Sequence, residues 1–65
     1  MYKAFTRTWW KVNKSWPNGL EPHAGRKTWF PETFQTDAEA SAFCREWNGE
    51  NPAGRLSRKA EYTEA

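Results

Sequence analysis

Two side chains in the 65-residue sequence are of types that commonly perform nucleophilic or acid–base chemistry, the lone histidine His23 and the lone cysteine Cys44. A histidine acts as a general base only where rigid neighbours hold it beside a nucleophile and an orienting acid. His23 lies in a stretch rich in proline and glycine, which provides no such hold. Cys44 falls on an apolar helical stripe, where a free cysteine behaves as a small hydrophobic residue. We therefore expect neither residue to be catalytic.

The segment Gly25-Arg26-Lys27-Thr28, with Gly19 upstream, is superficially similar to a phosphate-binding loop. That motif needs four residues between its glycines, a lysine directly after the second glycine, and a helix after that. Here five residues separate the glycines, an arginine follows Gly25, and a strand pattern comes next. A single cysteine also excludes an intramolecular disulfide and a zinc-finger site. The sequence therefore predicts no enzyme, no cofactor and no metal.

Cations and aromatic rings alternate along residues 3–11, and an extended backbone would place them on one face. Such a surface binds single-stranded nucleic acid, because rings stack on bases while cations contact phosphates. The alternative is that lysine and arginine stems cover rings only to keep the open side of a small sheet in water. The candidate surface, with its extension onto the next strand, consists of Lys3, Phe5, Arg7, Trp9, Lys11, Arg26, Lys27 and Trp29.

Protein recognition is a competing use of the same aromatic residues. Tryptophan, tyrosine and arginine dominate the hot spots of protein interfaces. If Trp9 or Trp16 is exposed, burial of its ring against another protein would be favourable. Self-association through an edge strand would also enlarge a small core. We therefore expect a host protein or a second copy of the chain as partner, with single-stranded or duplex nucleic acid as the alternative.

Three strands and one helix are needed to position these residues. Residues 2–12 are rich in aromatic and β-branched types and predict one long strand whose even-numbered side chains face the core. Turn residues crowd positions 13–25 and predict a long loop. Residues 26–35 predict a second strand, antiparallel to the first, with a kink at Pro31 because proline lacks the donor of a strand ladder.

The helix has clear signals at both ends. Thr36 and Glu39 form a capping box, and Asn48-Gly49 supplies a left-handed stop, so the helix is expected over residues 37–47. Its apolar stripe has the spacing i, i+3, i+4, i+7 and consists of Ala40, Phe43, Cys44 and Trp47.

Residues 57–62 alternate in a way that predicts a third strand, followed by a frayed tail at 63–65. The order is then β-β-α-β. The sequence predicts one α+β domain over residues 1–65, a small three-stranded antiparallel sheet packed against one helix. In this arrangement Phe43 and Trp47 of the helix press onto the face of Trp10.

Charge and composition narrow the functional classes further. The net charge is only +2; residues 1–35 carry six basic and two acidic side chains, and residues 36–65 carry four and six. A domain of this size buries too little apolar surface to be stable without an additional source of stability. The sources available to this chain are burial of its five tryptophans and self-association. Neither a secretory signal nor an apolar run of membrane-spanning length is visible. We expect a cytoplasmic protein that does not contact membranes.

Four segments of the chain resemble a family of short bacteriophage and prophage proteins of unknown function. They are Thr8-Trp9-Trp10-Lys11, Trp16-Pro17-Asn18-Gly19-Leu20-Glu21-Pro22, Ala24-Gly25-Arg26-Lys27 and Gly54-Arg55-Leu56-Ser57-Arg58-Lys59-Ala60-Glu61. The resemblance covers nearly the full chain and implies no activity. It implies a phage accessory protein in the host cytoplasm, of a class whose members often bind host proteins or nucleic acids.

Overall fold

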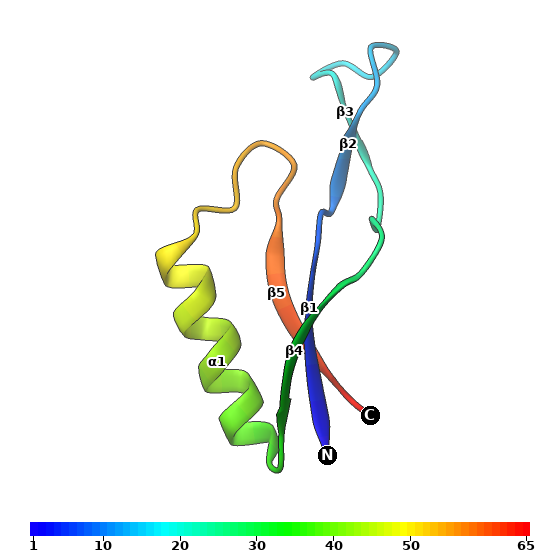
Figure 1. Cartoon of the computed structure of the whole chain (residues 1–65). Helices are drawn as coiled ribbons and strands as arrows, with labels where there is room; N and C mark the ends of the chain where they lie inside the picture. Colours follow the sequence, from blue (N-terminus) through cyan, green and yellow to red (C-terminus); the bar gives the residue numbers. More distant parts are fainter.

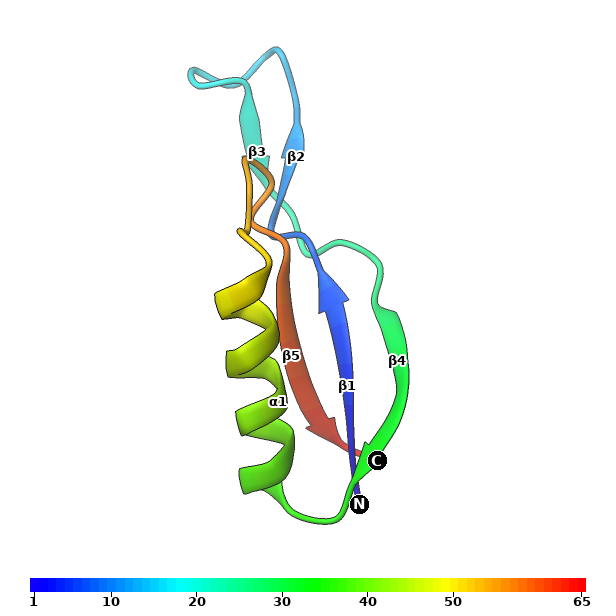
Figure 2. The same ribbon diagram turned by 60° about the vertical axis from the view of Figure 1, so that its left-hand side comes forward.

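A three-stranded antiparallel sheet forms the body of the molecule in a computed structural model that describes all 65 residues. The central strand β1 (Tyr2–Arg7) pairs with β4 (Thr28–Phe34) on one side and with β5 (Lys59–Glu64) on the other (Figure 1). The single helix α1 (Asp37–Glu50) runs alongside β5 (Figure 2) and packs on one face of the sheet, where it also contacts β1 and β4. The expected α+β fold, with its order β-β-α-β, is confirmed for this sheet and helix.

The contact between helix and sheet is built from small residues. Ala4 of β1, Ala40 of α1 and Ala60 of β5 are buried, and Cys44 packs with Ala4 and Ala60. Because alanine has no side chain beyond Cβ, the helix can approach the sheet closely at these positions. Larger rings pack around this contact from β4 and α1, namely Phe30, Phe34, Phe43 and Trp47.

The helix begins as the sequence predicts and ends later. The Thr36 hydroxyl oxygen accepts the Glu39 backbone N–H at 3.2 Å and donates to Glu39 Oε1 at 3.1 Å, which is the expected capping box. At the other end the helix runs through Gly49 and stops at Glu50, where both the backbone N–H and the side-chain amide of Asn51 donate to the Trp47 carbonyl. Asn48 and Gly49 are therefore helical rather than a helix stop, and the Asn48 side chain bonds to β5.

The expected strand over residues 2–12 is two strands. β1 ends at Arg7, and β2 (Trp10–Val12) starts after a bend at Trp9. The backbone N–H groups of Trp9 and Trp10 both donate to the Leu56 carbonyl, at 3.0 and 3.2 Å, so a distant loop replaces the sheet partner there. Trp10 therefore lies outside the main sheet, and Phe43 and Trp47 pack on Phe30 rather than on Trp10.

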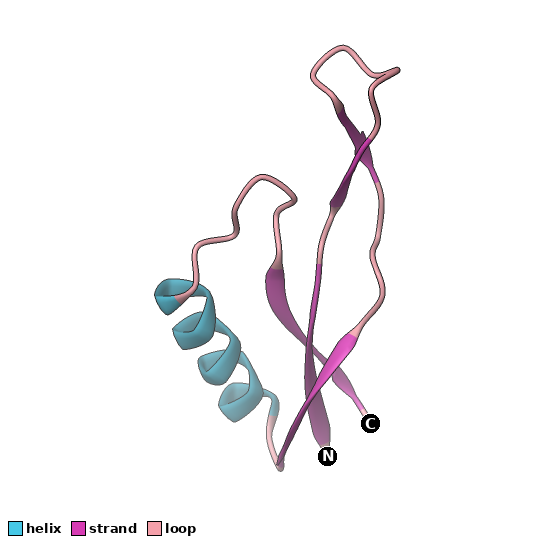
Figure 3. Cartoon of the chain, turned by 45° about the horizontal axis from the view of Figure 1, so that its top comes forward, coloured by secondary structure: helices cyan, strands magenta, loops and turns pink.

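Part of the predicted loop at 13–25 is a strand. β3 (Leu20–Pro22) pairs antiparallel with β2, and the two form a hairpin that projects beyond the main sheet (Figure 3). Two successive turns close it: Trp16 N–H donates to the Asn13 carbonyl, and Gly19 N–H donates to the Trp16 carbonyl. Gly19 has a φ of +75°, a conformation that glycine adopts without strain. The protein measures 43 × 22 × 16 Å.

The last strand extends further than predicted. Tyr2 and Lys3 pair with Glu64 and Thr63, and the Ala65 N–H donates to the Met1 carbonyl, so the 63–65 segment expected to fray continues the sheet. The two termini therefore lie side by side (Figure 1). The helix α1 lacks the length and apolar character needed to cross a membrane.

Candidate binding surface

Five residues on the open face of the sheet form a cation–aromatic ladder, in the order Trp9, Arg7, Phe5, Lys27, Trp29. The Arg7 guanidinium carbon lies 4.8 Å from the centre of the Trp9 ring and 4.9 Å from that of Phe5. The Lys27 ammonium lies 4.8 Å from the Phe5 ring centre and 5.6 Å from that of Trp29. Each cation is thus placed to interact with two rings, which contributes about 0.5–1 kcal/mol per contact at exposed sites.

The central ring of the ladder, that of Phe5, is buried. Phe5 is only 3% exposed, because Arg7 and Lys27 lie over it and the Trp29 ring meets it edge-on at 5.0 Å. Trp29 comes into reach because it is the cross-strand partner of Phe5. Phe5 is therefore not available to stack on a ligand, whereas Trp9 and Trp29 are 37% and 48% exposed.

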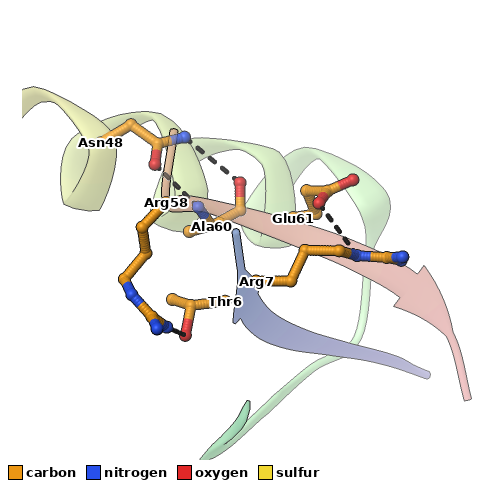
Figure 4. Close-up of polar contacts among 6 residues, drawn as sticks. All are labelled: Thr6, Arg7, Asn48, Arg58, Ala60 and Glu61. Carbon is orange, nitrogen blue, oxygen red and sulfur yellow. Dashed lines mark hydrogen bonds and ion pairs between the residues drawn. The ribbon is translucent and has the colours of Figure 1, made fainter. Parts of the chain in front are cut away.

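Arg7 is also partly neutralised from the neighbouring strand. Its Nε lies 3.4 Å from Glu61 Oε2, and Glu61 is the residue of β5 opposite Phe5 (Figure 4). The Arg7 side chain is 18% exposed, so little of its charge faces solvent. Of the two cations in the ladder, Lys27 is the exposed one.

The other predicted residues do not join the ladder. Lys3 lies on the same face, further along β1, and is exposed; Arg26 is exposed in the segment before β4. Lys11 belongs to the hairpin, where its Nζ lies 3.0 Å from Glu21 Oε2 on the opposite strand. Hydrogen bonding to Lys11 lowers the pKa of Glu21 below its usual 4.5. Trp16 lies at the hairpin tip.

Three exposed apolar side chains lie on the hairpin or at the bend that leads into it, and we refer to them together as the hairpin surface: Trp9, Val12 and Trp16. Val12 is 59% exposed and Trp16 is 42% exposed, so these side chains are only partly covered by the rest of the chain. These three residues account for half of the large hydrophobic side chains that the protein exposes, the others being Met1, Trp29 and Tyr62. Large apolar side chains left exposed on a projecting element are candidates for an interaction site.

Comparisons with known proteins identify no relative. No protein-family model, characterised protein or solved structure matches the chain. The role of the protein is therefore inferred from the geometry and chemistry of its own surface.

The two reactive residue types lie apart from each other. His23 is exposed after β3, and its backbone N–H donates to the Trp9 carbonyl. Cys44 is buried between α1 and the sheet, and burial, with a contribution from the charge of Glu61, raises the pKa of its thiol. No three or more histidine, cysteine or acidic side chains lie close enough together to hold a metal ion.

Two polar features of the structure were not predicted from the sequence. One is the ion pair of Glu61 with Arg7, and the other is a pair of hydrogen bonds between the Asn48 side chain and the backbone of Ala60 (Figure 4). The alternation of Lys59 and Glu61 with Ala60 and Tyr62 indicates which residues share the open face with Arg7. The sequence offers no comparable signal for Asn48, because Asn48-Gly49 is also a typical helix end.

Proposed function

We propose that the protein is a non-catalytic binding module that contacts another protein through the hairpin surface. The observation that carries this proposal is the exposure of Val12 and Trp16 on a hairpin that projects from the main sheet, and of Trp9 at the bend that leads into it, from 37% to 59%. Transfer of such side chains from water into an interface is favourable, at about 25 cal/mol per Å² of apolar area. A tryptophan at the tip of a projecting element is also well placed to enter a pocket on a partner.

The hairpin is organised before it meets a partner. Its tip is held by the two turn bonds at Trp16 and Gly19, by the Asn13 N–H to Gly19 carbonyl bond, and by the Asn18 side chain, which accepts the Leu20 N–H. The Lys11–Glu21 ion pair lies between its strands. Preorganisation of this kind reduces the conformational entropy lost on binding.

A host protein in the cytoplasm is the partner that we favour. This choice is compatible with the expected resemblance to short phage proteins, a class whose members often bind host proteins or nucleic acids. Self-association is the second form of the same proposal. Light scattering on the purified chain at several concentrations separates the two, because a dimer doubles the mass without any other protein.

The test uses two exposed tryptophans as a matched pair. The wild-type chain, Trp16→Ala and Trp29→Ala are immobilised and exposed to a bacterial lysate, and the captured proteins are quantified by mass spectrometry. We expect Trp16→Ala to lose a partner that Trp29→Ala retains. Identical profiles for the wild type and Trp16→Ala would count against the hairpin surface, once circular dichroism has shown all three chains to be folded.

Nucleic-acid binding is a second candidate, favoured by one feature of the ladder. Lys27 places an exposed ammonium beside the exposed Trp29 ring, which combines a phosphate contact with a stacking platform. Titration of single-stranded and duplex DNA, followed by tryptophan fluorescence at two salt concentrations, tests it. Binding that weakens with salt and is lost in Trp29→Ala but kept in Trp16→Ala would support this candidate. No quenching at low salt would remove it.

A further inference from the structure

We propose that the free edge of β5 and the groove beside α1 take up an extended segment of a partner polypeptide that carries a carboxylate opposite Arg45. The site is separate from the hairpin surface and goes beyond the function proposed above. The groove has a volume of about 490 Å³. It is lined from α1 by Ser41, Cys44, Arg45 and Asn48, and from β5 by Ala60, Glu61 and Tyr62.

The backbone of β5 faces this groove at alternate residues. The Ala60 N–H donates to Asn48 Oδ1 at 2.8 Å, and Asn48 Nδ2 donates to the Ala60 carbonyl at 3.2 Å, so both backbone groups of Ala60 point away from β1 (Figure 4). In an antiparallel ladder this orientation repeats every second residue. The N–H and C=O groups of Tyr62 and Glu64 therefore also point away from β1.

Asn48 acts as a short substitute for a neighbouring strand. Its amide offers one donor and one acceptor to Ala60, as the backbone of a paired residue would. The strand edge is satisfied at Ala60, whereas no side chain bonds to the backbone of Tyr62. An added strand can thus begin where Asn48 ends.

The two edge strands of the sheet, β4 and β5, differ in how readily they can pair with an added strand. β4 contains Pro31, which has no N–H, and its register with β1 shifts between Lys3 and Phe5. Both features protect an edge from strand addition. β5 has neither feature, since six consecutive residues pair with β1 in unbroken register. Strand addition is therefore expected at β5.

The charge of the groove indicates the chemistry of the occupant. Arg45 is exposed and forms no ion pair, whereas the charge of Glu61 is taken up by Arg7 on the open face. The unbalanced charge lining the groove is thus positive, and guanidinium groups bind carboxylates in a bidentate geometry. The backbone edge supplies main-chain hydrogen bonds and Arg45 supplies selectivity, as in other cases of strand addition.

A second copy of the chain is the alternative occupant of the edge. Two β5 strands related by a two-fold axis at Tyr62 would pair Ala60 of each copy with Glu64 of the other. The backbone of Ala60 is already bonded to Asn48, so this register leaves only the Tyr62 pair. A two-fold axis at Thr63 would instead pair Tyr62 of each copy with Glu64 of the other. A separate peptide can pair with both Tyr62 and Glu64 and brings no second helix to the edge, whereas in such a dimer the α1 of each copy, which lies beside its own β5, would stand at the shared edge. The separate peptide is therefore the occupant that we propose.

The test begins with selection of random 12-residue peptides on the immobilised full chain, followed by synthesis of the enriched sequences. Each is made in three forms: with a free C-terminal carboxylate, amidated with its acidic side chains, and amidated with glutamine in their place. The first two forms distinguish a terminal from a side-chain carboxylate. Amide shifts in the ¹⁵N-labelled chain are expected at Tyr62, Glu64 and Arg45, and Arg45→Gln is expected to weaken binding about tenfold or more.

A second variant tests the strand edge without changing a side chain. The 65-residue chain is short enough for chemical synthesis with an N-methyl group on the Tyr62 amide, which removes the outward donor and leaves the bonds to β1 intact. Binding is expected to fall about tenfold or more, as for a lost backbone hydrogen bond at an interface.

Several results would overturn the proposal. They are the absence of enriched peptides, enriched peptides that shift only hairpin amides, binding that N-methylation at Tyr62 leaves unchanged, and equal binding of the glutamine form. A dimer in light scattering that N-methylation abolishes would identify a second copy as the occupant instead. Trp16→Ala is expected to bind the peptides normally, so a failure here is distinguishable from a failure of the hairpin surface.

Discussion

The chain that leaves β3 passes close to Thr8 at Gly25. Its N–H donates to the Thr8 carbonyl at 2.8 Å, and a Cβ atom on Gly25 would lie 2.5 Å from Thr8 Oγ1 and 3.3 Å from the Thr8 carbonyl oxygen. We expect Gly25→Ala to lower the free energy of unfolding by about 1–3 kcal/mol, as for other forced overpacking. In a domain of this size each kcal/mol corresponds to a fall in Tm of about 4–8 °C in thermal denaturation.

Gly49 provides the matched control. It lies inside α1, and a Cβ atom there would meet nothing within 4 Å. Gly49→Ala is expected to raise the free energy of unfolding by about 0.5–1 kcal/mol, because alanine loses less backbone entropy in a helix. Equal changes in the free energy of unfolding for the two variants would contradict the close contact between Gly25 and Thr8.

Cys44 offers a second test at the level of one side chain. Burial raises the pKa of its thiol above the usual 9.0. The thiol is then harder to ionise in the folded than in the unfolded chain, so this residue stabilises the fold below about pH 9 and loses that contribution as the pH rises. We expect an aromatic disulfide reagent to modify Cys44 slowly in the folded protein and rapidly in denaturant. Equal rates would contradict the buried position.

The roles of single residues were predictable where the neighbours in sequence decide them. The capping box at Thr36 and the turn at Trp16-Pro17-Asn18-Gly19 follow from local chemistry and are present. Gly25 was assigned only to a turn-rich loop, because its need for a missing Cβ comes from Thr8, seventeen positions earlier. Contacts between distant residues leave no local pattern.

Among the elements, the link between α1 and β5 is the most testable. We expect Asn48→Ala to lower the free energy of unfolding by about 1–2 kcal/mol, since it leaves the N–H and C=O groups of Ala60 without their partner. Hydrogen exchange should show faster exchange at the Ala60 amide. The Glu61 amide, which faces β1, should stay protected and serves as the internal control. An Ala60 amide whose exchange is unchanged would refute the Asn48 bonds.

The hairpin is expected to respond to acid. The pKa of Glu21 is lowered in the folded chain, so its carboxylate stabilises the hairpin above about pH 4.5 and this contribution is lost as the pH falls through the lowered value. Lys11→Met should raise the pKa of Glu21 toward 4.5, which a carboxyl-carbon NMR titration measures. A Glu21 pKa that the substitution does not move would show that Lys11 is not its partner.

The elements themselves were largely predictable, but their ends were not. Alternation and turn residues indicated the strands, yet the break between β1 and β2 depends on the Leu56 carbonyl, which accepts from Trp9 and Trp10. The sequence around Thr8 contains no glycine or proline that would end a strand. Likewise β3 needs β2 beside it, and its Pro22 made a loop the more reasonable expectation.

The molecule as a whole has a small core and an elongated shape. Its buried residues are small apart from Phe5, and no large side chain is fully buried. The tryptophans therefore do not stabilise the fold from inside the core; they pack around its edge or face solvent. Such a domain has modest stability of its own and gains from any partner that covers its exposed rings.

The candidate surface was predictable in composition and not in arrangement. The sequence placed Lys3, Phe5, Arg7, Trp9 and Lys11 on one open stripe. The structure keeps Arg7 with its neighbouring rings, buries Phe5 beneath Lys27, and moves Lys11 to the hairpin. Which ring is covered depends on the register of β1 with β4, and this register shifts within the strand.

Site-specific photocrosslinking is the measurement that bears most directly on the hairpin surface as the contact with a partner protein. Trp16 in one chain, and exposed Glu32 of β4 in a second, is replaced by a photoreactive phenylalanine analogue, and both chains are irradiated in a bacterial lysate. We expect a discrete crosslinked product from position 16 and none from position 32. No product at either position, or the same products at both, would contradict a binding role for the hairpin.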